Sequence, residues 1–164
     1  MVGLETERLR FRQWKESDFE EIRIFFSSEE HARFVGGLKN QEDSWRLMAT
    51  YTGHYTLKGY SYLAVMEKSK EQLIGTVGLW NSTPWPEPEL GYWLLPAHQG
   101  KGYGLEAGIA VRNYAKESLQ LPSLVSYIDS NNESSKKLAL GLGARLDGKV
   151  MLLEFGEHEV YRYW

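Results

Sequence analysis

The sequence predicts a mixed α/β fold in a single domain that spans residues 1–164. Strand-like segments occur both as an uninterrupted group of three and singly between helical segments. Loops rich in glycine or proline separate several of these segments, as is typical where strands and helices connect. The predicted order is strand, helix, helix, three strands, helix, strand, helix and two strands.

The first third of the chain predicts one strand followed by helices. Residues 8–14 alternate between apolar and charged side chains, which indicates a half-buried strand. The Ser-Asp-Phe-Glu stretch at 17–20 fits a capping box, with Ser17 at the start of a helix. After a short helical piece over 29–35, Asn40 is expected to cap a longer helix that ends at Gly59.

The rest of the chain predicts strands broken by two helices. Residues 60–68 and 72–80 flank a polar turn and indicate a hairpin. The proline-rich loop 81–88 cannot join a ladder, so the next strand starts at residue 89. The later segments are a strand over 89–95, a helix over 105–119, a strand over 123–128, a short helix from about residue 134, and strands over 149–155 and 158–164.

Composition excludes several classes of function. Nineteen basic and twenty-two acidic residues give a net charge of −3, so no basic surface for nucleic acid is expected. No apolar run is long enough to cross a membrane, and residues 1–10 lack the apolar stretch of a signal peptide, so we expect no membrane partner and a cytoplasmic location. The absence of cysteine excludes disulfides, thiolate metal sites and a cysteine nucleophile, and we expect no metal.

The stretch Gln-Gly-Lys-Gly-Tyr-Gly at 99–104 places three glycines at alternate positions just before a predicted helix. The first turn of a helix carries unpaired N–H groups and partial positive charge, and glycines let an anion approach the backbone. A tight strand-to-helix turn without a ligand is the alternative. Three glycines with Lys101 among them favour an anion site.

Three kinds of phosphate site compete for this loop. The Walker pattern GxxxxGK[ST] is absent. Residues 102–107 fit GxGxxA, and Asp129 follows where a ribose-binding acid would lie. However, too few residues follow Asp129 to complete a dinucleotide fold, and strand 89–95 lacks the Val/Ile-rich character of a central parallel strand. The third possibility is a site for the pyrophosphate of coenzyme A.

The motifs resemble those of the GNAT superfamily of acyl-CoA-dependent N-acetyltransferases. Residues 99–104 match its pyrophosphate loop, Q/R-x-x-G-x-G/A, at every fixed position, and residues 132–135 match its Asn-x-x-Ser element. The Gly-Leu-Gly-Ala at 141–144 lies where the family has a Leu-Gly-Phe turn. Further segments resemble the Rim-type ribosomal-protein N-terminal acetyltransferases; these are 4–22, 73–79, 89–96 and 100–107.

This resemblance implies a central mixed, mostly antiparallel sheet with one splayed strand pair and helices on both faces. It also implies transfer of acetyl from acetyl-CoA to a primary amine, by direct attack in a ternary complex because no cysteine is present. The backbone of Leu94 and Leu95 would pair with the pantetheine arm, and the amides of 100–104 would hold the pyrophosphate. The implied cosubstrate-binding residues are Leu94, Leu95, Gln99, Gly100, Lys101, Gly102, Tyr103, Gly104, Asn132 and Ser135.

Glu89 is the expected general base, acting through water, because it matches the family's glutamate at the start of the splayed strand. The alternative for Glu89 is a surface carboxylate at a strand end. The family's thiolate-protonating Tyr, seven residues after the Asn, is replaced by Ala139. Ser135 or water would then donate that proton. His98 is expected on the loop surface.

Trp85 and Glu87 are the expected acceptor-binding residues, and the two neighbouring glutamates favour a cationic acceptor. The aromatic residues expected around that cleft are Trp45, Tyr51, Tyr55 and Trp80. The compatible acceptors are a ribosomal-protein N-terminus, a polyamine, an antibiotic or a small amine, and family likeness favours a peptide N-terminus. The resemblance is also compatible with a homodimer. A non-catalytic acyl-CoA sensor of the same fold is the rival function, kept open by the missing Tyr at 139.

Overall fold

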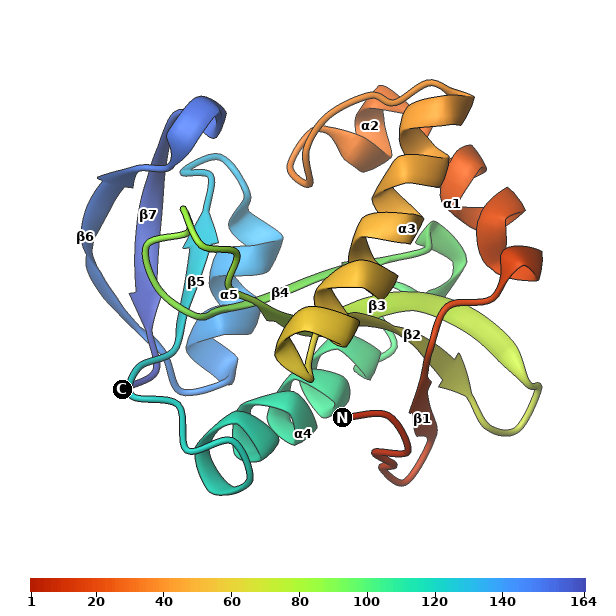
Figure 1. Ribbon diagram of the computed structural model, residues 1–164. Helices are drawn as coiled ribbons and strands as arrows, with labels where there is room; N and C mark the ends of the chain where they lie inside the picture. The colour runs from red at the N-terminus through yellow and green to blue at the C-terminus, as the bar shows by residue number, and fades with distance from the viewer.

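The computed structural model describes residues 1–164, built around a seven-stranded sheet in the order β1-β2-β3-β4-β5-β7-β6 (Figure 1). The strands are β1 (Leu9–Arg12), β2 (Tyr62–Glu67), β3 (Gln72–Trp80), β4 (Glu89–Leu94), β5 (Val125–Ile128), β6 (Arg145–Met151) and β7 (Glu157–Arg162). The helices are α1 (Phe19–Phe26), α2 (Glu29–Ala32), α3 (Gln41–Lys58), α4 (Tyr103–Glu117) and α5 (Glu133–Gly141), with 3₁₀ turns η1 (Glu16–Asp18), η2 (Pro96–His98) and η3 (Leu153–Phe155).

The sheet is antiparallel except where β4 and β5 run parallel in its middle. These two strands pair only where Glu89 lies opposite Val125, and they diverge beyond that point. The predicted mixed, mostly antiparallel sheet with one splayed pair is therefore confirmed. The splay leaves one edge of β4 free of strand partners in the centre of the molecule.

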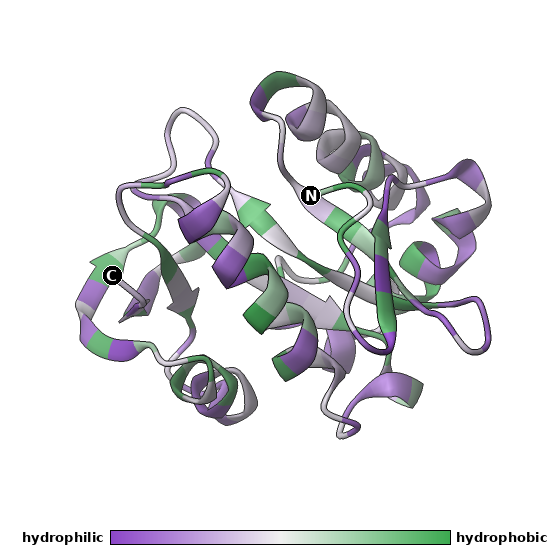
Figure 2. Ribbon diagram, turned by 90° about the horizontal axis from the view of Figure 1, so that it is seen from below, coloured by the Kyte–Doolittle hydropathy of each residue, from purple (hydrophilic) through white to green (hydrophobic).

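Helices cover both faces of the sheet, as predicted (Figure 1). Successive residues of a strand point to opposite faces, so Leu90 packs in the core cluster of α4, whereas Trp93 packs in the cluster of α1 and α3. Figure 2 shows alternating hydrophilic and hydrophobic bands along the helices, as expected when one helix face packs on a sheet. Removing each such large apolar side chain from water contributes about 1.5–3 kcal/mol.

The ends of α3 follow the sequence prediction. The Asn40 Oδ1 accepts a hydrogen bond from the Asp43 N–H at 2.8 Å, which satisfies one unpaired donor of the first turn. Gly59 adopts a left-handed conformation with φ of 78° and ends the helix.

The predicted capping role of Ser17 is wrong. Residues 16–18 form the turn η1, and the Asp18 carboxylate accepts a hydrogen bond from the Lys15 N–H at 2.8 Å. Both oxygens of Asp18 also accept from the guanidinium of Arg12, at 2.7 and 2.8 Å. This ion pair, whose Asp18 is buried and whose Arg12 is half-buried, joins β1 to the start of α1, and a serine hydroxyl could not form it.

The predicted strand over 149–155 is displaced. Strand β6 starts at Arg145 and ends at Met151, and the next residues turn away as η3. Leu152 is buried and its N–H donates to the carbonyl of Gly156 at 2.8 Å, while Leu153 has a positive φ of 47°. A strand cannot hold that conformation, so the apolar residues here form a turn that reaches Trp85 and the Glu89 end of β4.

Candidate functional site

The glycine loop joins η2 to the first turn of α4. Gly100 and Gly102 have positive φ of 70° and 80°, and Gly102 is the N-cap of α4. No atom lies within 4 Å of the place where a Cβ on Gly100 would be. Backbone N–H groups at this helix start are therefore accessible to an anion, which fits the sequence prediction.

A salt bridge from the N-terminal segment holds the loop in position. Arg8 Nη1 donates to the Lys101 carbonyl at 3.0 Å, and Arg8 Nε pairs with Glu106 at 2.6 Å. The Arg8 guanidinium also lies 4.5 Å from the centre of the buried Tyr103 ring. Arg8 thus supports the loop through the Lys101 carbonyl, Tyr103 and Glu106.

Gly104 serves close packing. A Cβ at this position would lie 3.0 Å from Leu138 Cδ2 and 3.6 Å from Leu94 Cδ1. The missing side chain of Gly104 therefore lets α4 approach α5 and β4. The sequence had instead suggested that this glycine makes room for the pyrophosphate.

Only one of the two predicted backbone positions on β4 faces the splay. The Leu95 N–H donates to the Ile74 carbonyl on β3 at 2.9 Å, so it is already paired. Leu94 faces the other way, since its carbonyl accepts a hydrogen bond from Gln99 Nε2 at 2.9 Å. Because backbone groups alternate along a strand, Tyr92 and Leu94 present theirs to the open edge, and the expectation for Leu95 is wrong.

The start of α5 faces that open edge from the other side. Asn132 Oδ1 caps α5 by accepting the Ser135 N–H at 3.2 Å. Across the splay, the Tyr92 hydroxyl donates to the Ser135 carbonyl at 3.1 Å. Tyr92 thereby bridges β4 and α5, a contact that the sequence reasoning missed because nothing local links the two positions.

These elements enclose one groove, which we call the glycine-loop cleft, of about 460 Å³. Among its lining residues are Leu94, Gln99, Gly100, Gly102, Gly104, Asn132 and Ser135. The structure thus brings together residues that the sequence predicted from two motifs about thirty positions apart. Leu95, Lys101 and Tyr103 are not part of this lining.

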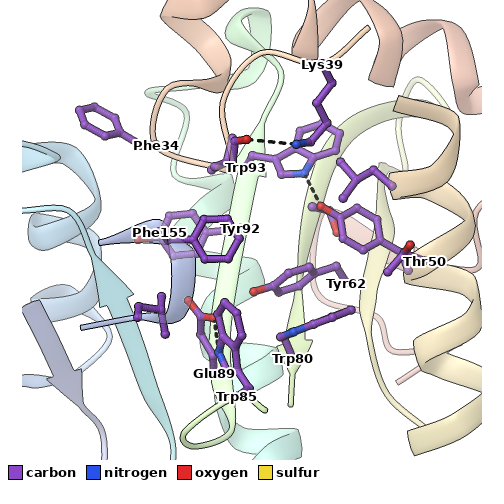
Figure 3. A pocket seen from close by; sticks show the side chains of 16 residues that line it. Phe34, Lys39, Thr50, Tyr62, Trp80, Trp85, Glu89, Tyr92, Trp93 and Phe155 are labelled. Carbon is purple, nitrogen blue, oxygen red and sulfur yellow. Dashed lines mark hydrogen bonds between the residues drawn. The ribbon is translucent and has the colours of Figure 1, made fainter. Parts of the chain in front are cut away.

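A second cavity of about 270 Å³, the Glu89 pocket, lies on the α3 side of β4 (Figure 3). Glu89 is only 8% exposed, so the alternative of a surface carboxylate is wrong. Trp85 Nε1 donates a hydrogen bond to Glu89 Oε2 at 2.9 Å. Burial raises the pKa of Glu89 to about 8, and the hydrogen bond from Trp85 limits the rise.

Aromatic rings surround this carboxyl. The rings of Tyr62 and Trp80 stack with centroids 5.8 Å apart, and Trp85 meets Phe155 of η3 edge-on at 5.9 Å. Figure 3 shows the Tyr62 hydroxyl pointing toward Glu89. Tyr62 can lie there because Gly91 on β4, two strands away, has no Cβ, which would collide with the Tyr62 hydroxyl. A glycine inside a strand often marks such a close approach, and this signal could have identified Tyr62.

The two cavities are neighbours, since Phe34, Val35, Tyr92 and Trp93 line both. A group held in the glycine-loop cleft and a group held beside Glu89 can therefore meet near Tyr92. Proton transfer and nucleophilic attack both require such close approach.

The predicted acceptor residues divide into two sets. Trp85, Tyr51 and Trp80 line the Glu89 pocket. Trp45 instead meets Phe19 of α1 edge-on at 5.2 Å, and Tyr55 packs against the opposite core cluster.

Glu87 lies outside the pocket lining. Its two oxygens accept hydrogen bonds from Arg162 at 2.8 Å each, and this pairing holds the pKa of Glu87 below its ordinary value. Both oxygens of Glu87 are therefore held by Arg162, which also pairs with Asp147, and Glu87 does not face the pocket where an acceptor would lie.

No group of three or more His, Cys, Asp or Glu side chains is arranged to hold a metal ion. None of the helices combines the length and apolar character that crossing a membrane requires.

Comparison with known proteins agrees with this geometry. The family model described as "Acetyltransferase (GNAT) domain" matches residues 8–145. An uncharacterized N-acetyltransferase, YoaA of Bacillus subtilis, is 28% identical over 148 residues, covering 88% of this chain and 84% of YoaA. The ribosomal-protein-serine acetyltransferase of Escherichia coli is 29% identical over 121 residues, covering 72% of this chain and 65% of that protein.

Among solved structures, an acetyltransferase of Agrobacterium tumefaciens superposes with a TM-score of 0.90 at 33% identity, covering 98% of this chain and 93% of the other. Together with the family match, the splayed β4 and the glycine loop before α4, this likeness confirms the resemblance noted in the sequence. The chain belongs to the GNAT acetyltransferase family and is an N-acetyltransferase.

Proposed function

We propose that this enzyme transfers the acetyl group of acetyl-CoA to a primary amine held in the Glu89 pocket. The observation that carries the proposal is a buried carboxyl in a cavity that shares four lining residues with the glycine-loop cleft. The glycine-loop cleft suits the thioester, and the Glu89 pocket suits the amine. Their shared wall at Tyr92 is where the two reactants would meet.

The residues of the glycine-loop cleft fit coenzyme A. Backbone N–H groups at Gly100, Gly102 and the start of α4 would bind the pyrophosphate, and the Lys101 ammonium would add positive charge beside them. The open backbone of Leu94 would pair with the pantetheine arm, with Gln99 bracing its carbonyl. Asn132 keeps the start of α5 in place. Bound acetyl-CoA supplies an acyl group activated as a thioester.

Glu89 would act as the general base. As the amine nitrogen bonds to the acyl carbon and the carbon–sulfur bond breaks, the Glu89 carboxylate accepts the proton that the nitrogen loses. A pKa of about 8 makes Glu89 a better proton acceptor than an exposed glutamate would be. The aromatic walls exclude water and strengthen this interaction.

The departing sulfur needs a proton, and two hydroxyls lie near the shared wall. Ser135 lines the glycine-loop cleft, and Tyr92 lines both cavities. Burial raises the pKa of Tyr92 above its ordinary value, so its phenol stays protonated and able to donate. Either hydroxyl could take the place of the tyrosine that Ala139 replaces.

The decisive test is Glu89→Gln, which keeps shape and removes the basic group. Release of free CoA thiol should fall by roughly 10²–10⁴-fold with any amine that the wild type accepts. The rise in melting temperature caused by CoA should remain, because ligand that binds only the folded state stabilises it. The residual rate should climb with pH as more amine loses its proton unaided.

Glu67→Gln is the matched control, since Glu67 is also a strand glutamate only 8% exposed but lies outside both cavities. This variant should keep wild-type turnover. Full turnover in Glu89→Gln would remove Glu89 from the mechanism. The relatives, all named as acetyltransferases, do not support the non-catalytic sensor, and CoA binding without thiol release from any amine would revive it.

A further inference from the structure

We infer that the acceptor is a compact primary monoamine with an aromatic or branched apolar body. Its amine would lie at Glu89 and its body against the aromatic wall of the pocket. This inference rests on the proposed function and names the substrate class of the same site.

The charged groups of the Glu89 pocket are few. Among the sixteen lining residues, Glu89 is the single acid and Lys39 the single base. The Lys39 ammonium donates to the Gly36 carbonyl at 3.1 Å, at the loop that precedes α3. The hydroxyl of Thr76 is also satisfied, since it donates to the Leu63 carbonyl at 2.6 Å. The pocket therefore offers one anionic partner, Glu89, to an amine.

The aromatic rings are placed to receive that amine and the carbons attached to it. Tyr62 and Trp80 from β2 and β3 flank one side of Glu89, and Trp85 and Phe155 flank the other (Figure 3). An ammonium near aromatic faces is stabilised by cation–π attraction, and an apolar body is stabilised by leaving water. Further apolar lining for the body comes from Phe34, Val35, Leu47 and Trp93.

A polyamine suits this pocket poorly. Its second ammonium would find no acid among the lining residues and would meet Lys39 instead. Glu87 is not among the lining residues, and both of its oxygens are directed to Arg162 rather than into the pocket. An unpaired charge in an apolar cavity carries a large desolvation penalty.

A peptide N-terminus also suits it poorly. An extended peptide needs hydrogen-bond partners for its own N–H and C=O groups, whereas eleven of the sixteen lining residues are hydrophobic. The cavity of about 270 Å³ is at the small end for ligand sites, which typically span about 300–1,000 Å³. A small compact molecule fills such a space.

Binding can be measured without turnover, because Trp80, Trp85 and Trp93 line the pocket. We would titrate the CoA-saturated protein with 2-phenylethylamine, with spermidine and with a short peptide bearing a free N-terminal serine, following tryptophan fluorescence. Phenylethylamine should change the emission at concentrations at least about tenfold lower than the other two amines. Equal or tighter binding of spermidine or the peptide would overturn the inference.

Thiol release measured with the same three amines then tests whether their kcat/KM values follow the same order as their binding. Phe155→Ala should raise KM for phenylethylamine about three- to tenfold with little change in kcat, as expected for one lost aromatic contact. Phe155→Leu should recover part of that loss. Leu57→Ala is the control, because Leu57 is 85% exposed on α3 and touches neither cavity.

The outcomes separate this inference from the proposed function. If spermidine or the peptide is acetylated and phenylethylamine is not, the enzyme stands as proposed and the monoamine inference fails. If phenylethylamine binds in the pocket but no amine is acetylated, the proposed function fails while the pocket's preference for an apolar monoamine stands. An unchanged KM in Phe155→Ala would exclude the aromatic wall from acceptor binding.

Discussion

The glycine-loop cleft and the Glu89 pocket share the wall around Tyr92 and are built in different ways. The cleft combines β4, the glycine loop and the first turn of α5, which offer main-chain groups to a ligand, with side chains from residues 25–35. The pocket is formed by side chains from α3, β2, β3, the 81–88 loop and η3. A ligand bound by main-chain groups tolerates side-chain change, whereas a ligand bound by side chains does not. Acceptor choice can therefore vary without disturbing the cosubstrate half of the site.

The largest expected effect is the loss of CoA binding through a substitution in the glycine-loop cleft. Gly102→Val should abolish the rise in melting temperature that CoA causes, because Gly102 has a φ of 80° and a branched side chain strains the N-terminus of α4. Gly148→Val is matched in strain, with a φ of 95° and nothing within 4 Å, but lies in β6 away from both cavities. It should lower stability yet preserve the CoA shift. Retained CoA binding in a folded Gly102→Val protein would contradict the phosphate role of the loop.

A smaller effect is expected at the shared wall. If Tyr92 protonates the departing sulfur, Tyr92→Phe should lower kcat by about 100-fold and leave KM for the amine near wild type. Ser135→Ala is the companion variant, because its hydroxyl is the other candidate donor and its carbonyl still accepts from Tyr92. Turnover measured with a series of acyl thioesters of different leaving-group pKa separates them. The donor's variant should lose most with the most basic thiolate, and a uniform loss would mark a packing role.

The buried Glu89 should also make the free energy of unfolding depend on pH. Burial raises the pKa of Glu89 from 4.5 to about 8, so the folded state holds a proton that the unfolded chain releases. This contribution is complete below about pH 4.5 and is lost as pH rises through about 8. The free energy of unfolding of wild type relative to Glu89→Gln should therefore fall by a few kcal/mol between about pH 5 and about pH 9. Urea unfolding at both pH values measures the difference, and parallel behaviour would contradict a buried acid.

The smallest effect is expected just outside the pocket. Glu87→Gln should leave KM for the amine within about twofold of wild type, because Arg162 rather than a ligand pairs with Glu87. Its cost in stability should be about 0.2–1 kcal/mol, as is usual for a partly exposed ion pair. A tenfold rise in KM would instead return Glu87 to the acceptor site.

Much of the fold could be predicted because it depends on local patterns. Asn40 and Gly59 set the ends of α3 through capping that involves a few neighbouring residues. The displaced β6 shows where such reasoning fails, since Leu152 and Leu153 have the composition of a strand but form a turn. Leu152 is buried in a core cluster against Trp85, and this tertiary contact fixes the turn that Leu153 follows.

The sequence by itself determined the loop at 99–104, the Asn-x-x-Ser element at 132–135 and the glutamate at the start of β4, because each lies in a short motif whose geometry is local. Only the tertiary structure decided which side chains surround Glu89, that Arg162 binds Glu87, and that Tyr92 reaches α5. These contacts join residues far apart in the chain, and their energies come from burial and pairing that no local pattern encodes. The raised pKa of Glu89 is of this kind, because desolvation depends on every segment that closes around the carboxyl.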